Sequence, residues 1–196
     1  MPTGVAIRDP RTQLFEAAER VLLRDGPSGL TSRAVTTEAG CAKGVLHRHF
    51  ADFEDFLADL VLDRAALIRA QGADLRAAAG TGTVVDHVTD ALTALFGGMA
   101  TAVLGLVVFR EGLRARLRAA GVVGIPLMSE GTTAIADYLA AERDLGRVAR
   151  DADVGVLAVL LIGAAHLIAA GDPPEPGAVR KVVTTTLTGV LRAPAG

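Results

Sequence analysis

The 196-residue chain contains no tryptophan, one tyrosine and one cysteine. A single cysteine excludes an internal disulfide framework and is typical of a protein in a reducing compartment, so we expect a cytoplasmic location. Aromatic residues make up only 4% of the chain, whereas hydrophobic residues make up 51%, enough for a sizeable core. Few runs of alternating β-branched residues occur, so the sequence predicts an all-α fold built on aliphatic side chains.

The sequence also lacks the short motifs of common enzyme classes. It has no glycine-rich phosphate loop, no Gly-x-Ser-x-Gly and no His-Glu-x-x-His. Residues 1–10 are polar and have no apolar core, so we expect no secretory signal there. We expect neither enzymatic activity nor a cofactor.

An overall positive charge is missing as well, since the formal net charge is −2. Positive groups are nevertheless concentrated locally, because residues 31–50 hold Arg33, Lys43 and Arg48 against Glu38 alone. A small positive patch on an acidic body is compatible with specific recognition of nucleic acid. It also predicts weaker non-specific binding than a basic protein shows.

Residues 31–50 have the pattern of two short helices joined by a tight turn at Gly40. Thr31 is placed to cap the first helix with its hydroxyl, and Leu30 is placed to pack on Val35. Helices this short are marginal alone in water, so they must pack on neighbours. The outward face of the second helix then carries small and basic residues that suit a DNA major groove, about 12 Å wide, namely Lys43, Gly44, His47 and Arg48.

This segment resembles the DNA-binding helix-turn-helix of the TetR family of bacterial repressors. The resemblance runs from a first helix at about residues 11–25 into a long fourth helix. Three positions depart from the family pattern: Ala42 replaces a serine, His47 replaces a tyrosine that contacts phosphate, and Phe53 replaces a lysine.

The residues expected at the DNA share this motif, although for Arg33 and Thr36 a solvated outer face is the alternative. A metal site at Cys41, His47 and His49 is not expected, because helical residues two apart point in different directions. The expected DNA contacts are Thr31, Arg33, Thr36, Ala42, Lys43, Gly44, His47, Arg48 and His49.

Glycine and proline residues divide the rest of the chain into further helices, about nine in all. We expect a DNA-binding domain at residues 1–52 and a ligand-binding and dimerisation domain at residues 53–196. The later helices are predicted at about residues 83–102, 104–120, 125–143, 152–170 and 177–192.

Residues 154–170 form the most apolar stretch of the chain. A membrane span is not expected, because His166 lies inside the stretch, acidic residues flank it and no aromatic belt accompanies it. A helix apolar all round must be buried, and packing against a second copy of the chain would bury its outer side. In the resembled family the last two helices form the dimer interface, so the expected interface residues are Val156, Leu160, Gly163, Leu167, Val183 and Leu187.

A ligand cavity in the C-terminal part has weaker sequence support, since each of its candidate residues is also suited to plain core packing. Tyr138 and His166 are the better candidates, because a buried phenol or imidazole needs a polar partner. The candidate lining residues are Phe96, Met99, Phe109, Leu113, Met128, Tyr138 and His166.

The sequence and the resemblance together predict a homodimeric, ligand-responsive transcriptional repressor. It would bind an inverted-repeat operator in double-stranded DNA and be released by a small, mostly apolar effector. Two alternatives stay open: a helical small-molecule carrier or enzyme with an incidental helix-turn-helix, and a regulator without ligand response.

Overall fold

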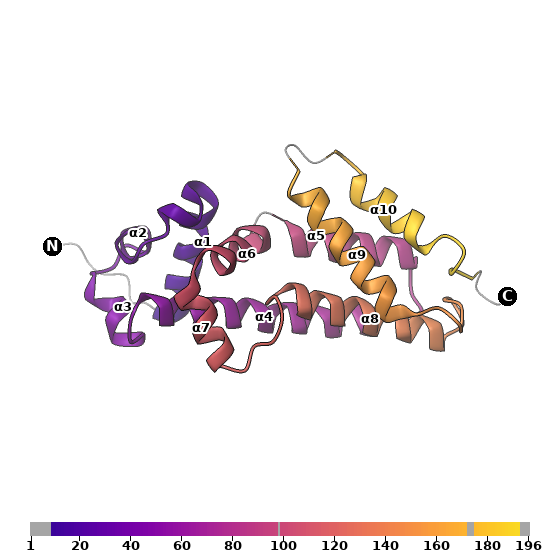
Figure 1. Cartoon of the computed structure of the whole chain (residues 1–196), viewed down its shortest axis with the longest axis horizontal. Coiled ribbons are helices and arrows are strands. Elements are labelled where there is room, and N and C mark those ends of the chain that lie inside the picture. The colour runs from indigo at the N-terminus through magenta and orange to yellow at the C-terminus, as the bar shows by residue number, and fades with distance from the viewer. Residues whose placement is uncertain (1–8, 98, 172–174, 193–196) are drawn as a thin grey trace. The chain divides into compact units, whose positions relative to one another are not determined.

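The computed structural model describes residues 9–97, 99–171 and 175–192, without the side chains of residues 99–101 and 109. The described part contains ten helices and no strand, apart from one isolated bridge between Val148 and Leu191 (Figure 1). The predicted all-α fold is confirmed. The helices are α1 (Pro10–Gly29), α2 (Ser32–Glu38), α3 (Gly44–His49), α4 (Phe53–Ala77), α5 (Val84–Phe96), α6 (Met99–Phe109), α7 (Glu111–Ala119), α8 (Met128–Asp144), α9 (Val154–Ala169) and α10 (Ala178–Leu187).

The first helix starts with a strong cap and changes direction near its end. The Asp9 side chain accepts hydrogen bonds from the backbone N–H groups of Arg11 and Thr12, and Pro10 occupies the first turn. Gly26 lies in the left-handed region (φ 70°), which interrupts the helical backbone inside α1. The break falls directly after residue 25, where the sequence predicts the helix to end.

Three helices, α5 to α7, stand where the sequence predicts two. The backbone becomes extended at Gly97 (φ −61°, ψ 120°) and again at Arg110 (φ −117°, ψ 104°). Neither neighbour of Arg110 is a glycine or a proline, so the sequence does not predict this break. This extra break raises the number of helices in the described residues to ten, one more than expected.

The chain divides into two compact units. The first comprises the described part of Met1–Leu62 together with Ala102–Val123, and the second comprises the described parts of Asp63–Thr101 and Gly124–Gly196. The first unit therefore includes α7 as well as the three N-terminal helices. A segment far along the chain thus completes the unit that contains the helix-turn-helix.

An aromatic cluster forms the centre of the first unit. Phe50, directly after α3, contacts Phe56 of α4 edge to face with ring centroids 5.0 Å apart, and Phe15 of α1 lies 5.7 Å from Phe56. All three rings are buried. The Arg11 guanidinium lies over the Phe50 ring at 4.6 Å. These contacts fix the end of α3 against α1 and α4.

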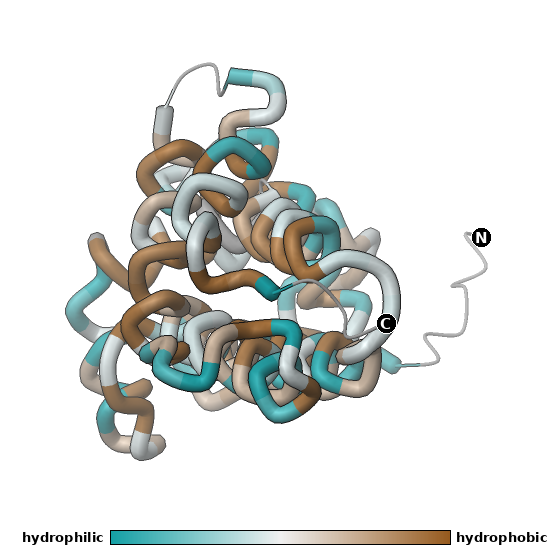
Figure 2. The backbone as a smooth tube through the Cα atoms, turned by 90° about the vertical axis from the view of Figure 1, so that its right-hand side faces the viewer, coloured by the Kyte–Doolittle hydropathy of each residue, from teal (hydrophilic) through white to brown (hydrophobic). Residues whose placement is uncertain are grey.

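In the second unit α9 packs between α8 and α10, and α10 also packs on α5. Hydrophobic and hydrophilic residues alternate along the helical turns (Figure 2), which gives each amphipathic helix an apolar side for the core. Helices α4 and α8 approach closely at Gly72, where an added Cβ would lie 2.7 Å from the Cβ of Ala134. No helix among the described residues is long and apolar enough to cross a membrane.

Candidate functional site

The helix-turn-helix is built by local hydrogen bonds that its sequence encodes. The Thr31 hydroxyl accepts from the Ala34 backbone N–H at 3.1 Å, the cap predicted from the sequence. Gly40, two residues after the end of α2, lies in the left-handed region (φ 64°), and the Cys41 N–H then donates to the Thr36 carbonyl at 3.0 Å. These bonds end α2 and turn the chain toward α3.

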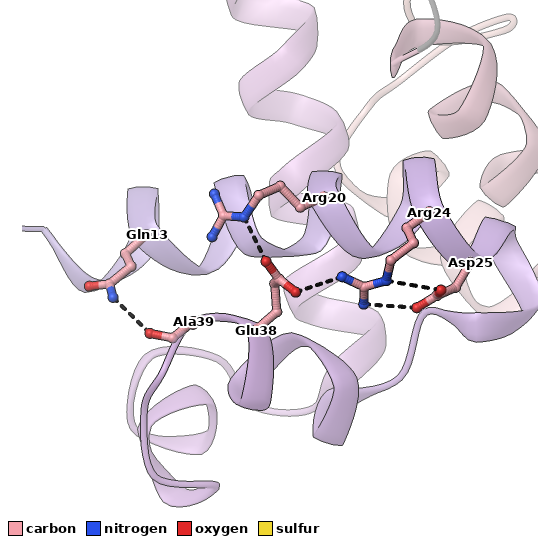
Figure 3. A network of polar contacts seen from close by, with 6 residues as sticks. All are labelled: Gln13, Arg20, Arg24, Asp25, Glu38 and Ala39. Carbon is pink, nitrogen blue, oxygen red and sulfur yellow. Dashed lines mark hydrogen bonds and ion pairs between the residues drawn. The ribbon is translucent and has the colours of Figure 1, made fainter.

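Side chains of α1 hold the far end of α2 in place (Figure 3). Gln13 Nε2 donates to the Ala39 carbonyl at 2.8 Å. The Glu38 carboxylate lies between two guanidinium groups and accepts from Arg20 and Arg24, each at 2.8 Å. These two charged hydrogen bonds, that of Arg24 first, lower the pKa of Glu38 below its ordinary value. The one negative side chain of the motif is therefore compensated by two arginines of α1.

The face of α3 opposite its buried side is open to solvent. Val45 and Leu46 face the core, whereas Lys43 and Arg48 are exposed and belong to no ion pair among the described residues. A Cβ added to Gly44 would meet no atom within 4 Å, so this glycine leaves open space at the start of the helix. The residues that form this exposed reading face are Ala42, Lys43, Gly44, His47, Arg48 and His49.

The cap residue Thr31 and Arg33 of α2 are exposed, whereas Thr36 of α2 is only 3% exposed. The Thr36 hydroxyl donates within the helix to the carbonyls of Ser32 (3.0 Å) and Arg33 (3.2 Å). The expected outward position of Thr36 is therefore corrected: its hydroxyl is used inside the motif, and its side chain packs in the core.

Arg110 is a positioning residue that sequence reasoning missed. Its guanidinium donates to Glu54 Oε1 at 2.9 Å and to the Leu30 carbonyl at 3.0 Å, and it lies 5.5 Å from the Phe53 ring centroid. Leu30 directly precedes the Thr31 cap, so this contact holds the entry to α2. No local pattern in the sequence predicts a contact between residues 80 positions apart.

One side of α9 presents an apolar surface to solvent. Leu160 is 54% exposed and Leu167 is 74% exposed, and Val156 and Val159 are exposed beside them. A Cβ added to Gly163 would meet nothing within 4 Å. The opposite side of α9, with Ala158, Leu161, Ile162 and Ala165, is buried. We call Val156, Val159, Leu160, Gly163 and Leu167 the outer face of α9.

Two other residues expected at the dimer interface lie elsewhere. Val183 and Leu187 are both 0% exposed, because α10 packs this side on α5 and α9 of its own chain. They belong to the core of the second unit, which corrects their expected place.

The candidate ligand-binding residues do not gather in one place. Leu113 is buried in the first unit, whereas Phe96 and His166 lie in the second with ring centroids 5.8 Å apart. Tyr138 is fully buried, and Met128 begins α8. The side chains of Met99 and Phe109 lie outside the described residues.

A cavity of about 360 Å³ lies in the second unit between α4, α5 and α8. None of the candidate residues with a described side chain lines it. Its walls combine apolar residues such as Ile68, Leu95 and Ile135 with polar groups such as Asp74 and Asp90. A wider hollow of about 790 Å³ lies along α4 and α8, lined in part by Arg69, Arg76 and Asp137.

No cluster of His, Cys, Asp or Glu side chains that could hold a metal ion occurs in the part of the chain that the structure describes. The Cys41 thiol is partly buried, and this burial raises its pKa.

Comparison with known proteins places these features in a family. Residues 14–60 match the family model of bacterial regulatory proteins, tetR family. No curated protein sequence matches the chain.

Solved structures match the chain over nearly its whole length. A TetR transcriptional regulator from Agrobacterium tumefaciens is 19% identical, with a TM-score of 0.63 and coverage of 93% of this chain and 94% of that one. FadR from Bacillus subtilis, solved in complex with stearoyl-CoA, is 15% identical with a TM-score of 0.67, covering 91% and 98%. SmeT, the repressor of the Stenotrophomonas maltophilia multidrug efflux pump SmeDEF, is 16% identical with a TM-score of 0.65, covering 96% of each chain.

At these identities the structural matches show the fold, while the family model assigns the helix-turn-helix. Residues 14–60 belong to the tetR family of bacterial regulatory proteins, and the chain as a whole has the fold of that family's solved transcriptional regulators.

Proposed function

We propose that this transcriptional regulator is a repressor that binds an inverted-repeat DNA operator as a homodimer and is released by a small organic effector. The observation that carries the proposal is the reading face of α3. This face exposes two cations that have no ion-pair partner among the described residues, two imidazoles and a glycine, while the other side of the helix is fixed in the core.

The composition of this face suits binding in a DNA major groove. Lys43 and Arg48 supply charge for phosphates or guanine edges, and Gly44 lets the backbone approach closely. His47 and His49 add ring nitrogens that can bond to phosphate. Because the bonds of Figure 3 tie α2 to α1, the motif meets DNA as a rigid body and loses little entropy on binding.

The outer face of α9 supports the homodimer. Five apolar or small residues on one side of one helix leave a patch that a soluble protein normally covers. A two-fold interface places the same patch of each copy against the other, and Gly163 lets the helices approach closely. Two-fold symmetry in the protein then predicts a palindromic operator, with half-sites about one helical turn or a small multiple apart.

The cavity between α4, α5 and α8 supports release by an effector. Its volume of about 360 Å³ lies at the lower end of the range for small-molecule sites. A ligand there lowers DNA affinity only if it binds the DNA-free state more tightly than the DNA-bound state. FadR from Bacillus subtilis, which shares the fold, was solved with stearoyl-CoA.

Selection from random double-stranded DNA tests the proposal. We expect recovery of one inverted repeat that binds two chains per site. Recovery of single, non-palindromic sites would contradict the dimeric arrangement. The rival function, a helical carrier or enzyme with an incidental helix-turn-helix, predicts that no sequence is enriched at all.

A further inference from the structure

The cavity of the second unit has a polar end and an apolar end. Two contacts between α5 and α8 show which residues lie at each end. At one end, His87 of α5 lies beside Tyr138 of α8, with 2.9 Å between His87 Nδ1 and the phenol oxygen. At the other end, a Cβ added to Gly131 of α8 would lie 2.5 Å from Leu95 of α5. Residues 87 and 138 therefore mark one end, and residues 95 and 131 mark the other.

Helix α4 runs in the same direction as α8 along the cavity. Arg69 contacts Glu130, Gly72 lies against Ala134 at the middle, and the Gly80 N–H donates to Glu142 beyond Tyr138. Asp74 lies on the side toward Tyr138, and Ile68 lies on the side toward Gly131. Asp90 of α5 is one turn from His87. The charged lining groups thus gather toward the Tyr138 end. The opposite end is formed mainly by apolar residues such as Ile68 and Leu95, with the uncharged side chain of Gln71 beside Gly72.

The charged side chains at the polar end are both negative. Asp74 and Asp90 are both exposed at the cavity, and neither takes part in an ion pair among the described residues. The lining residues include no lysine or arginine. Two uncompensated carboxylates repel an anion and attract a cation, and the effect is stronger in a half-enclosed site than in open water.

His87 at this end is held in one orientation by a buried network. The Tyr138 hydroxyl donates to Glu142 Oε1 at 2.6 Å, and Glu142, which is fully buried, also pairs with Arg147 at 3.4 Å. Burial and the Glu142 carboxylate raise the pKa of Tyr138 far above its usual range, so the phenol keeps its proton.

Because that single proton is donated to Glu142, the phenol oxygen must accept from His87 Nδ1–H. In the neutral ring the other nitrogen, Nε2, is then a hydrogen-bond acceptor. The Nε2 atom lies against the loop at Gly82, where an added Cβ would be 3.0 Å from it. The groups at this end that can bind a ligand are therefore the two carboxylates, which favour a positively charged hydrogen-bond donor.

We propose that the cavity binds an amphiphilic organic amine, with its protonated nitrogen between Asp74 and Asp90 and its apolar body toward Ile68 and Leu95. This inference rests on the proposed function only in naming the amine as the effector. The binding itself stands independently of DNA.

Three probes with the same alkyl chain and different head groups test this ligand class: decylamine and decanoate, each below its micellar concentration, and decanol below its solubility limit. Isothermal titration of the full chain is expected to show binding in the order decylamine, decanol, decanoate. Asp74→Asn/Asp90→Asn should weaken decylamine about tenfold, the sum of two partly exposed ion pairs, and leave decanol unchanged.

The matched control is Asp137→Asn/Asp144→Asn, which removes two exposed carboxylates of α8 that do not line the cavity. It should leave decylamine binding as in the wild type. Ala91→Phe, which fills the cavity from α5, should abolish binding of all three probes.

Tighter binding of decanoate than of decylamine would overturn the proposal, as would an equal loss of decylamine affinity in the control. DNA binding by the same variants separates this inference from the proposed function. If decylamine binds as expected but does not change DNA affinity, the ligand class stands and effector control fails. If DNA binding responds to decanoate instead, effector control stands and the ligand class fails.

Discussion

Arg110 and Leu30, 80 positions apart in the sequence, are joined by a 3.0 Å hydrogen bond from the guanidinium to the backbone carbonyl. The same guanidinium is paired with Glu54, so one side chain connects the start of α7, the start of α4 and the entry to α2. A buried carbonyl at a helix entry needs a donor, and Arg110 supplies a charged one.

Replacing Arg110 with methionine should destabilise the first unit. The change keeps most of the apolar stem but leaves the Leu30 carbonyl and Glu54 without their donor. We expect a loss of about 2 kcal/mol in the free energy of unfolding, measured by urea denaturation at fixed protein concentration. Arg118→Met, on the exposed side of α7, is the control and should change little. Equal stability of both variants would show that the Arg110 contacts contribute nothing.

The hydroxyl of Thr31, and not the volume of its side chain, should stabilise the start of α2. Thr31→Ala removes the oxygen that accepts from the Ala34 N–H and should cost about 1 kcal/mol, whereas Thr31→Ser keeps it. Urea denaturation of the two variants gives the comparison. If serine fails to restore stability, the hydroxyl is not what holds the start of α2.

Acid should weaken the ion pairs of Glu38 that hold α2 against α1. The pKa of Glu38 is lowered in the folded protein by Arg24 and Arg20, so its stabilising effect is complete above the ordinary pKa of 4.5. It is lost as the pH falls through the lowered folded value. Glu38→Gln should therefore reduce stability at pH 7 and lose its effect progressively below about pH 4.5. A difference from wild type that persists unchanged into strong acid would contradict this role.

A charge on the outer face of α9 should dissociate the dimer. Leu160→Arg would place an unpaired guanidinium in an apolar interface, at a cost of several kcal/mol, roughly 3 or more. Sedimentation velocity should show a monomer, with DNA affinity reduced although no reading residue has changed. Leu145→Arg, at a residue 57% exposed at the end of α8, should remain dimeric. A dimeric Leu160→Arg protein would move the interface to another surface.

Much of this structure could be predicted from local signals. The Thr31 cap, the turn at Gly40 and the buried position of Val35 follow from residue type and helical period, which depend only on near neighbours in the sequence. The exposed side of α3 follows from the same period.

What could not be predicted depends on distant partners. The break at Arg110 interrupts a sequence that reads as one continuous helix, and the contacts of its guanidinium lie in other parts of the chain. Thr36 is predicted on the outer side of the first motif helix as a DNA contact, but its hydroxyl is satisfied inside its own helix. Likewise the cavity takes its polar groups from α4 and α5, where Asp74 and Asp90 read as ordinary surface residues.

The central claim, that α3 reads DNA, is tested most directly by Lys43→Ala, with fluorescence anisotropy of the selected operator measured over a range of salt. Lys181, the other lysine of the chain, lies exposed on α10, so Lys181→Ala is a matched control. We expect Lys43→Ala to weaken binding by about 1–3 kcal/mol if Lys43 contacts a base, or to reduce the salt slope by about one per site if it contacts phosphate. The control should match the wild type in both affinity and slope. Wild-type affinity and salt dependence in Lys43→Ala, together with wild-type binding by Gly44→Leu, would show that α3 does not enter the groove and would contradict the proposed function.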